Sequence, residues 1–326
     1  MRKSDVSIGR VFGNYRIRSR IACGSFGCVY LAQHLWLNRI AAIKLLHTTL
    51  LHSSSEQQRF QREARILEKL WHPSIVRILD YGISHGLPYL VLEYASHGSL
   101  SDFLKHQTGF LAVEEALTIL AQVGEALHFA HQNGIIHHDL KPANILFDSQ
   151  NRVLLTDFGI AIARITSTVK HPAASAGTPR YMAPEQFLGK VGPKSDQYSL
   201  GCIAYELFTG RLPFLAPNTS ALAYMHIHDL PPAPREINPA LPWHIEYAIL
   251  RALEKDSSKR YPDIASFVAA LQAPPQAPEQ VTPQIFRRMV AQLLKEASRL
   301  SKLHRYEEAL ALCDQALQLN PHYLAS

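Results

Sequence analysis

The sequence predicts an α+β protein in which a sheet-rich first part is followed by a mostly helical second part. Apolar residues at every second position recur through the first ninety residues, which is the period of a half-buried strand. After Gly98 the apolar residues recur every three or four positions, which is the period of a helix packed on one face. Four prolines within residues 273–283 then predict an extended linker ahead of a separate helical tail.

The sheet-rich part begins with residues 15–21, where apolar side chains alternate with three arginines. A helix is predicted over 56–70, because Phe60, Ala64 and Leu67 fall on one helical face. The remaining predicted strands cover 28–33, 41–46, 75–81 and 89–93. In the second part a long helix is predicted from Val113 to about Gly134. Further helices are predicted over 195–209, 242–253 and 262–271.

The amino-acid composition indicates the broad class of protein. The chain has 326 residues, 47% hydrophobic and 18% charged, against about 25% charged in an average soluble domain. Buried cores are therefore expected, and a wholly disordered chain is excluded. Most of the net charge of +6 lies in the first twenty residues without a long basic run, so we expect no nucleic-acid partner. Charged residues interrupt every apolar stretch, so no membrane span is expected in this chain.

The four cysteines are Cys23, Cys28, Cys202 and Cys313. They contain no C-x-x-C pair, and their spacing does not suggest a disulfide framework or a zinc site. We therefore expect a reducing, cytoplasmic setting.

Residues 22–29, Ala-Cys-Gly-Ser-Phe-Gly-Cys-Val, lie between two predicted strands, which argues against a dinucleotide-binding turn between strand and helix. Glycines at 24 and 27 let backbone N–H groups approach phosphate oxygens, although glycines in a hairpin also serve the turn alone. Lys44 follows on the next strand. A lysine buried beside phosphate needs a counter-charge, and we expect Glu63 of the predicted helix to supply it.

Three further motifs follow in order. They are His-His-Asp-Leu-Lys-Pro-Ala-Asn at 137–144, Asp-Phe-Gly at 157–159 and Ala-Pro-Glu at 183–185. With the glycine loop and Lys44, this series resembles the eukaryotic-type (Hanks-type) Ser/Thr protein kinases, of the kind found in bacteria. The resemblance covers residues 10–272 and implies a two-lobed protein kinase fold. The N-lobe, an antiparallel sheet with one helix, would be 10–95, and the mainly helical C-lobe 96–272.

The resemblance implies an ATP site in which Lys44 binds the α and β phosphates and Glu63 orients the lysine. The backbone carbonyl of Glu93 and the N–H of Ala95 would read the adenine edge, with Leu92 as gatekeeper. The other implied nucleotide-binding residues are Ala22, Gly24, Ser25, Gly27, Val29, Ala42 and Leu146.

The resemblance also implies the catalytic residues. Asp139 would accept or orient the proton of the acceptor hydroxyl, and Lys141 would neutralise charge on the transferred phosphoryl group. Asn144 and Asp157 would hold Mg²⁺, with Mn²⁺ as an alternative. The implied activity is that of an ATP-dependent, non-specific serine/threonine protein kinase acting on proteins, including autophosphorylation.

Other matching residues are implied to be architectural. Leu67, Ile78, His137 and Phe158 resemble the column of side chains that joins the lobes, with His137 packing and hydrogen-bonding rather than acting as a base. Glu185 and Arg260 resemble the ion pair that braces the helical lobe.

Two departures from the family pattern matter. Ala22 replaces the first loop glycine, and His138 replaces an arginine that usually pairs with a phosphorylated activation-loop residue. An imidazole is mostly neutral at pH 7 and cannot form a bidentate fork. We therefore expect little dependence on phosphorylation of the hydroxyls between the Asp-Phe-Gly and Ala-Pro-Glu motifs. These are Thr166, Ser167, Thr168 and Ser175.

Two other functions remain open from the sequence. A pseudokinase scaffold would be supported only by the two departures. A small-molecule phosphotransferase of related fold would lack the Ala-Pro-Glu motif together with Asp196 and Arg260, which this chain has.

The tail, residues 284–326, resembles a tetratricopeptide repeat, a helical hairpin. Tyr306-Glu307-Glu308-Ala309-Leu310 fits the second helix, and Pro321 the end of the repeat. The resemblance implies a protein partner or self-association through 284–326.

Overall fold

A computed structural model describes residues 7–24, 27–46, 54–107, 109–158 and 179–273, together with positions 298, 301, 306, 307 and 310. The chain divides into two compact units, residues 1–273 and residues 274–326. In the second unit all the described positions are helical. The rest of the predicted tetratricopeptide-like hairpin, and the predicted linker after residue 273, lie outside the described residues.

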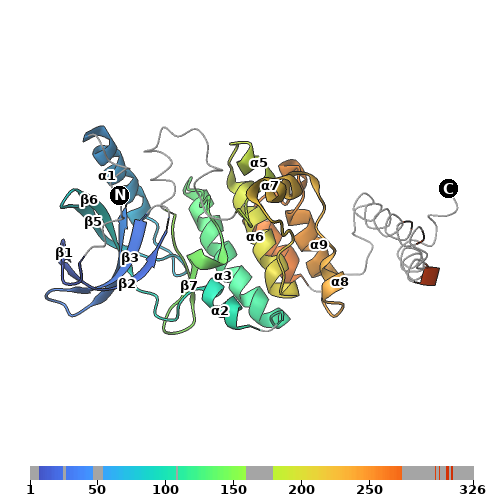
Figure 1. Ribbon diagram of the computed structural model, residues 1–326, viewed down its shortest axis with the longest axis horizontal. Coiled ribbons are helices and arrows are strands. Elements are labelled where there is room, and N and C mark those ends of the chain that lie inside the picture. The colour runs from blue at the N-terminus through green and yellow to red at the C-terminus, as the bar shows by residue number, and fades with distance from the viewer. Residues whose placement is uncertain are drawn as a thin grey trace. The chain divides into compact units, whose positions relative to one another are not determined.

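The first lobe of the larger unit is an antiparallel sheet, drawn in blue and teal in Figure 1. The strand order is β1-β2-β3-β4-β6-β5. Its strands are β1 (Val11–Phe12), β2 (Tyr15–Cys23), β3 (Gly27–His34), β4 (Ile40–Leu46), β5 (Ile78–Ser84) and β6 (Leu87–Glu93). Helix α1 (Ser54–Glu68) contacts β5. The predicted mostly-sheet lobe with a single helix is therefore confirmed for the described residues.

The first half of β2 shows why this segment forms a strand. Tyr15 and Ile17 are buried in a cluster with residues of β3, β4 and β6, whereas Arg16 and Arg18 are exposed. This is the alternation expected of a sheet with one covered face. Beyond Ile17 the register shifts twice and the strand becomes exposed, so its end is held less by packing than its beginning.

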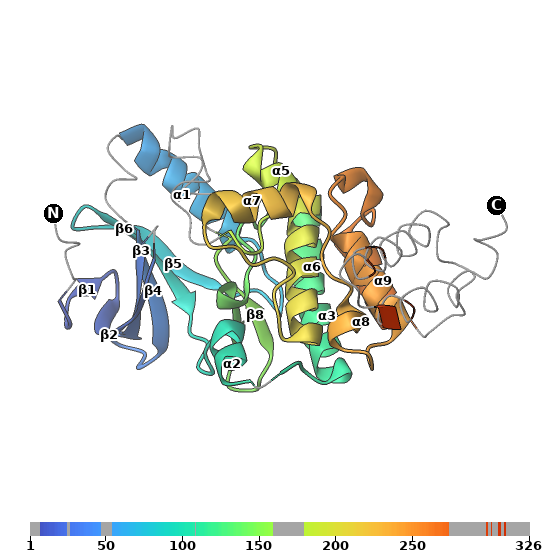
Figure 2. The same ribbon diagram turned by 45° about the vertical axis from the view of Figure 1, so that its right-hand side comes forward.

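The second lobe is mainly helical (Figures 1 and 2). Its elements are α2 (Leu100–His106), α3 (Val113–Gln132), η2 (Pro142–Asn144), β7 (Ile145–Phe147), β8 (Val153–Leu155), α5 (Pro184–Phe187), α6 (Pro193–Thr209), α7 (Thr219–His228), α8 (Pro234–Ile237), α9 (Trp243–Ala252), η4 (Ser257–Lys259) and α10 (Ile264–Gln272). Helix α3 packs against α6 and α10, and α9 packs against both of those. None of the helices within the described ranges has the length and apolar character that crossing a bilayer requires.

The predicted helices lie within about two residues of their predicted ends, but α2, α5, α7 and α8 were not predicted. Helix α2 has seven residues and is started by Ser99, whose hydroxyl accepts from the N–H of Asp102 at 3.1 Å. In α7 only Leu222 and His226 are buried, so its apolar residues do not form one stripe.

The predicted strand 75–81 is wrong at its beginning. Ser74 and Val76 exchange backbone hydrogen bonds with Leu155 of β8, at 2.8 and 2.9 Å. Strand β5 itself starts at Ile78, where the chain turns to pair with β6. The first part of the apolar run therefore ties the sheet lobe to the helical lobe, which local periodicity does not distinguish from one continuous strand.

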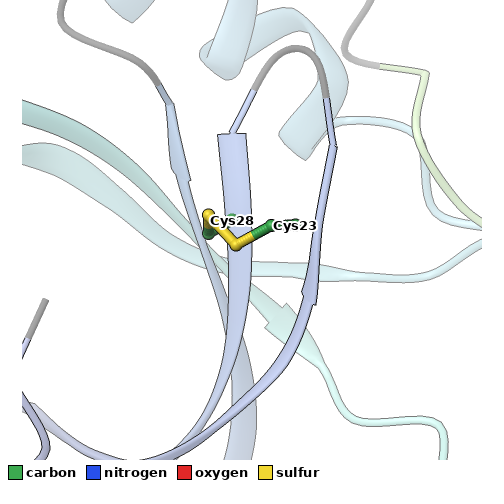
Figure 3. The surroundings of a disulfide bond; sticks show 2 residues. All are labelled: Cys23 and Cys28. Carbon is green, nitrogen blue, oxygen red and sulfur yellow. A yellow bond between two sulfur atoms is a disulfide. The ribbon is translucent and has the colours of Figure 1, made fainter. Parts of the chain in front are cut away.

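The expectation that the cysteines do not form disulfides is also wrong. The sulfur atoms of Cys23 and Cys28 are bonded at 2.05 Å (Figure 3). The two residues are separated by five positions, but the hairpin between β2 and β3 places them directly opposite each other. The inference of a reducing setting from cysteine spacing therefore loses its basis. Cys202 is free and buried, and Cys313 lies outside the described residues.

Candidate active site

The register of the sheet places the predicted nucleotide-binding side chains on one face. Directly paired residues point to the same face of a sheet. Ala22 pairs with Val29, and Val29 pairs with Lys44. Ala42 lies two residues before Lys44 on β4 and so shares its face, and it pairs with Leu92 of β6. Small and apolar side chains therefore surround the lysine on this face.

Lys44 links the sheet to the segment that follows β8. Its Nζ donates a hydrogen bond to Oδ1 of Asp157 at 2.7 Å, and its side chain is 9% exposed. Burial alone would raise the pKa of Asp157, but the charge and hydrogen bond of Lys44 outweigh it, so the pKa lies below its ordinary value. Asp157 is therefore a carboxylate at neutral pH.

Glu63 lies on α1 with a half-buried side chain. Within the described part of the chain no ion pair joins it to Lys44, whose counter-charge is Asp157 instead. A buried ammonium needs one close carboxylate, and Asp157 meets that need in this conformation. A role for Glu63 in orienting Lys44 stays a prediction.

The predicted catalytic residues lie together around η2. Nζ of Lys141 donates to Oδ2 of Asp139 at 2.5 Å, and Nδ2 of Asn144 donates to the backbone carbonyl of Asp139 at 2.8 Å. The side chains of Lys141 and Asp139 are 36% and 26% exposed. A carboxylate and an ammonium are thus held in contact with each other while remaining open to an incoming group.

One buried carboxylate holds the backbone of the catalytic loop, residues 137–144. Asp196, at the start of α6, accepts from the N–H groups of His137 and His138 at 2.8 and 3.0 Å, and contacts Nε2 of His131 at 2.8 Å. Burial would raise the pKa of Asp196, but these hydrogen bonds and the two imidazoles lower it. His138 has φ of 69°, a conformation that costs a non-glycine residue about 1–3 kcal/mol. The bond to Asp196 helps to hold it there.

His137 has the architectural role that was predicted. It is fully buried, and its Nε2 lies 2.8 Å from the carbonyl of Thr156. Since a carbonyl can only accept, Nε2 carries the proton, while Nδ1 accepts from the N–H of Asp139 at 3.3 Å. The ring packs on Phe158 at a centroid distance of 4.8 Å. Phe158 shares a hydrophobic cluster with Leu67, and Ile78 packs against that cluster.

The predicted ion pair of the helical lobe is present. Nη1 and Nη2 of Arg260 donate to the two carboxylate oxygens of Glu185, both at 2.8 Å, and Arg260 is 2% exposed. The next residue, Gln186, donates from Nε2 to the backbone carbonyl of His138 at 3.0 Å. This link between the Ala-Pro-Glu motif and the catalytic loop was not predicted, because nothing in the spacing of a lone glutamine indicates it.

The two loop glycines are not equivalent. A Cβ on Gly27 would lie 2.1 Å from the backbone oxygen of Leu45, so the approach of β3 to β4 requires glycine there. A Cβ on Gly24 would meet nothing closer than 4.0 Å. Its phosphate contact, like that of Ser25, which lies outside the described residues, stays a prediction.

The predicted adenine-binding segment follows β6. The N–H of Glu93 donates to the carbonyl of Arg77 at 2.9 Å, which fixes the end of the strand. Among the described residues the N–H of Ala95 takes part in no hydrogen bond, and Ala95 is half-buried. Leu146 of β7 is half-buried and forms a bridge with Ser99 at the other end of this segment. The backbone here has an N–H available to a planar ligand.

The predicted metal ligands suit a hard cation that is completed by other oxygen atoms. Nδ2 of Asn144 is committed to Asp139, so its carbonyl oxygen points elsewhere, and Lys44 contacts only one oxygen of Asp157. Carboxylate and amide oxygens are ligands that Mg²⁺ prefers. Within the described ranges no cluster of three or more His, Cys, Asp or Glu forms a complete metal cage. The residues therefore fit a metal that phosphate and water help to coordinate.

The activation segment, which joins the Asp-Phe-Gly and Ala-Pro-Glu motifs, lies mostly outside the described residues. Gly159 and the four candidate phosphorylation sites fall in 159–178, beyond them.

Comparison with known proteins identifies the family. The protein kinase domain family model matches residues 15–322. The chain belongs to the protein kinase domain family. Of the curated proteins similar to this kinase domain, serine/threonine-protein kinase PknB of Mycobacterium leprae is 39% identical over 279 residues, covering 82% of the chain and 45% of PknB. Serine/threonine-protein kinase PrkC of Bacillus subtilis is 38% identical over 253 residues, covering 77% of the chain and 39% of PrkC.

Among solved structures, the kinase domain of Mycobacterium tuberculosis PknI is similar, with a TM-score of 0.65 and 28% identity. The match covers 82% of this chain and 99% of the PknI domain. The chain therefore has the two-lobed kinase fold, and it spans less than half the length of the curated relatives named above.

Proposed function

We propose that the protein transfers the γ-phosphate of ATP to serine and threonine hydroxyls of proteins, including its own. The observation that carries this proposal is that the pair Lys44–Asp157 lies next to the group Asp139, Lys141 and Asn144. The N–H of Thr156, the residue before Asp157, donates to the backbone carbonyl of Asn144 at 2.9 Å. The serine/threonine kinases PknB and PrkC, at 39% and 38% identity, support the choice of acceptor.

In this reaction, separate residues of the chain bind the nucleotide, orient the acceptor and compensate charge. Lys44 neutralises the phosphates of the nucleotide, and the free N–H of Ala95 donates to the hydrogen-bonding edge of the adenine. Asp139 orients the acceptor hydroxyl and takes its proton, and Lys141 compensates the negative charge that develops on the phosphoryl group. The small side chains Ala22 and Ala42 leave room beside the lysine for the base.

Mg²⁺, or Mn²⁺ in its place, would be held by Asp157 and Asn144. When bound, the ion supplies positive charge to the phosphate oxygens. The oriented amide of Asn144 and the ionised carboxylate of Asp157 are the features of this chain that suit it.

The test is a single-turnover assay with radiolabelled ATP, Mg²⁺ and a generic protein acceptor. Asp139→Asn should lose phosphotransfer by about 10²–10⁴-fold while still binding ATP, because Asp139 acts on the acceptor and not on the nucleotide. Lys44→Met should lose phosphotransfer by orders of magnitude as well. Asp229→Asn, a carboxyl-to-amide change at the end of α7 far from these residues in the sequence, is the matched control.

Near wild-type activity in both site variants would refute the proposal. It would favour the pseudokinase scaffold, which at present has only Ala22 and His138 in its favour.

For the tail we propose a tetratricopeptide-like module, residues 284–326, that binds a protein partner or a second copy of the chain, behind a linker at 273–283 and a kinase domain at 10–272. Support comes from the sequence pattern. Isolated two-helix repeats rarely bury their apolar face alone, so helicity of a 284–326 peptide that increases on adding the kinase domain would support docking. We also propose a cytoplasmic location, because ATP is available there, and a role in signal transduction.

A further inference from the structure

Two thiols bracket the tip of the glycine hairpin. Cys23 is the last residue of β2, and Cys28 is the residue of β3 that pairs with it. Their sulfur atoms form the disulfide seen in Figure 3. Just beyond this bond, the N–H of Gly24 donates to the carbonyl of Gly27 at 2.9 Å. The disulfide therefore closes the neck of the turn that is expected to cover the nucleotide phosphates.

The sheet register shows on which side of the hairpin the sulfur atoms lie. Val29 pairs with Lys44 and so shares its face, whereas Cys28 pairs with Leu45 on the opposite face. Cys28 accordingly packs against the hydrophobic cluster that contains Leu45. The disulfide therefore lies on the face away from the lysine and occupies none of the space that a nucleotide needs.

Among the described cysteines, Cys23 and Cys28 are the ones that solvent reaches. Cys23 is exposed and Cys28 half-buried, whereas Cys202 is fully buried, and burial raises the pKa of its thiol. The thiolate is the form that reacts, so an exposed pair is open to a small-molecule oxidant.

We propose that Cys23 and Cys28 are a reversible oxidation site that controls how fast nucleotide leaves the kinase site. This proposal rests on the nucleotide-binding function proposed above. A thiolate of the pair attacks a small-molecule disulfide and releases one small thiol. The second cysteine then attacks the mixed disulfide, which forms the Cys23–Cys28 bond and releases the second small thiol. The two protein sulfurs are oxidised and the small disulfide is reduced, with both protons leaving on the two thiols or to solvent.

The consequence for nucleotide exchange follows from the position of the bond. A loop over bound phosphates must lift for the product to leave, and such openings often limit turnover. The end of β2 is exposed and follows two register shifts, so without the disulfide little side-chain packing would oppose its movement away from β3. The disulfide fixes the two strands at the neck, with the paired Cα atoms 4.1 Å apart. The two strands of the oxidised chain therefore cannot separate at this point.

The experiment compares the full chain after treatment with dithiothreitol and after treatment with oxidised glutathione, each followed by removal of the reagent. Release of a fluorescent ADP analogue is followed by stopped flow while unlabelled ADP is added in excess. We expect release about tenfold slower from the oxidised chain and a return to the original rate on reduction. Thiol alkylation and peptide mass spectrometry should show residues 23 and 28 linked.

The variants identify the thiols. The double variant Cys23→Ser/Cys28→Ser should release the analogue at the reduced wild-type rate under both treatments, whereas Cys313→Ser, the matched control, should keep the full response. A disulfide that forms without changing the release rate would overturn the proposal, and so would a response that persists in the double variant. Failure of the reduced chain to bind the analogue at all would overturn the nucleotide-binding function as well, which separates the two failures.

Discussion

The catalytic loop and the glycine hairpin are expected to act on the two ends of the same reaction, but the fold holds them by different means. The catalytic loop is fixed from behind by Asp196, which binds two successive backbone N–H groups, and by Gln186, which binds the carbonyl of His138. The described residues of the hairpin are joined at its neck, where Gly27 contacts β4 and a disulfide links the two strands. Buried polar bonds thus set the position of the group that acts on the acceptor, while backbone packing and one covalent bond hold the neck of the hairpin.

The largest effect should come from removing the support of the catalytic loop. Asp196→Ala leaves two buried N–H groups and a buried imidazole without their acceptor, and we expect a loss of about 3 kcal/mol in the free energy of unfolding. Phosphotransfer should also fall, because the orientation of Asp139 depends on this loop. Urea denaturation and a single-turnover assay measure the two effects, with Asp229→Ala as control. A loss below about 1 kcal/mol with normal turnover would contradict the comparison.

The second prediction concerns how the free energy of unfolding depends on pH through a buried histidine of the helical lobe. His226 of α7 is fully buried, and its pKa is lowered to about 3, chiefly by burial and then by the charge of Lys255. The ordinary pKa of a histidine is 6.5, so below pH 6.5 the imidazole of residue 226 binds a proton in the unfolded chain but not in the folded chain. The free energy of unfolding should therefore fall as the pH is lowered, and His226 should make it about 2 kcal/mol smaller at pH 5 than at pH 7. In His226→Gln this part of the pH dependence should disappear, as urea titrations at pH 7, 6 and 5 will show. Identical pH slopes for both proteins would contradict it.

A third change separates the two glycines of the hairpin. Gly27→Ala forces a methyl group against the backbone of Leu45 and should cost about 1 to 2 kcal/mol. Gly24→Ala brings its Cβ no closer than 4.0 Å to the backbone oxygen of Gly27 and should stay within about 0.5 kcal/mol of wild type. Thermal unfolding of both variants measures the difference. Equal losses would mean that the tip is packed as tightly as the neck.

The smallest effect is expected in the activation segment. Replacing Thr166, Ser167, Thr168 and Ser175 together by alanine should change initial rates little, because His138 cannot form the fork that an arginine gives to a phosphate. The measurement compares the initial rates of phosphotransfer of the quadruple variant and of wild type. A collapse of activity would show that another basic residue, such as Arg180, binds a phosphate there.

The sequence predicted best where a function resides in consecutive residues. Asp139, Lys141 and Asn144 lie within one short motif, so their grouping follows from the chain itself. The carboxylate that pairs with Lys44 could not be predicted in this way, since Glu63 and Asp157 lie on different elements and the choice depends on how α1 and β8 approach the sheet. Gln186 has a function only because the fold brings it under His138.

The same distinction applies to secondary structure. Helices α1, α3, α9 and α10 were predicted because their apolar residues form one stripe, whereas α7 was missed because its apolar residues do not. The apolar run that begins at Ile75 divides between two strand partners, which is a property of the assembled lobes. The disulfide was missed because spacing along the chain was considered without the hairpin that folds Cys23 onto Cys28.

The ion pair between Glu185 and Arg260 has a consequence for the order in which the protein is built. The two residues are 75 positions apart, and contacts of such long range form late, because the intervening chain must first be ordered. During synthesis Glu185 leaves the ribosome well before its partner, and α3 leaves before α10, whose Val268 covers Gly124. Until the last helices of the lobe emerge, an acidic side chain and an apolar helix face remain without their partners. The growing chain is therefore most exposed to misassembly just before the helical lobe is complete. The final helices supply the missing partners and complete the core of the lobe.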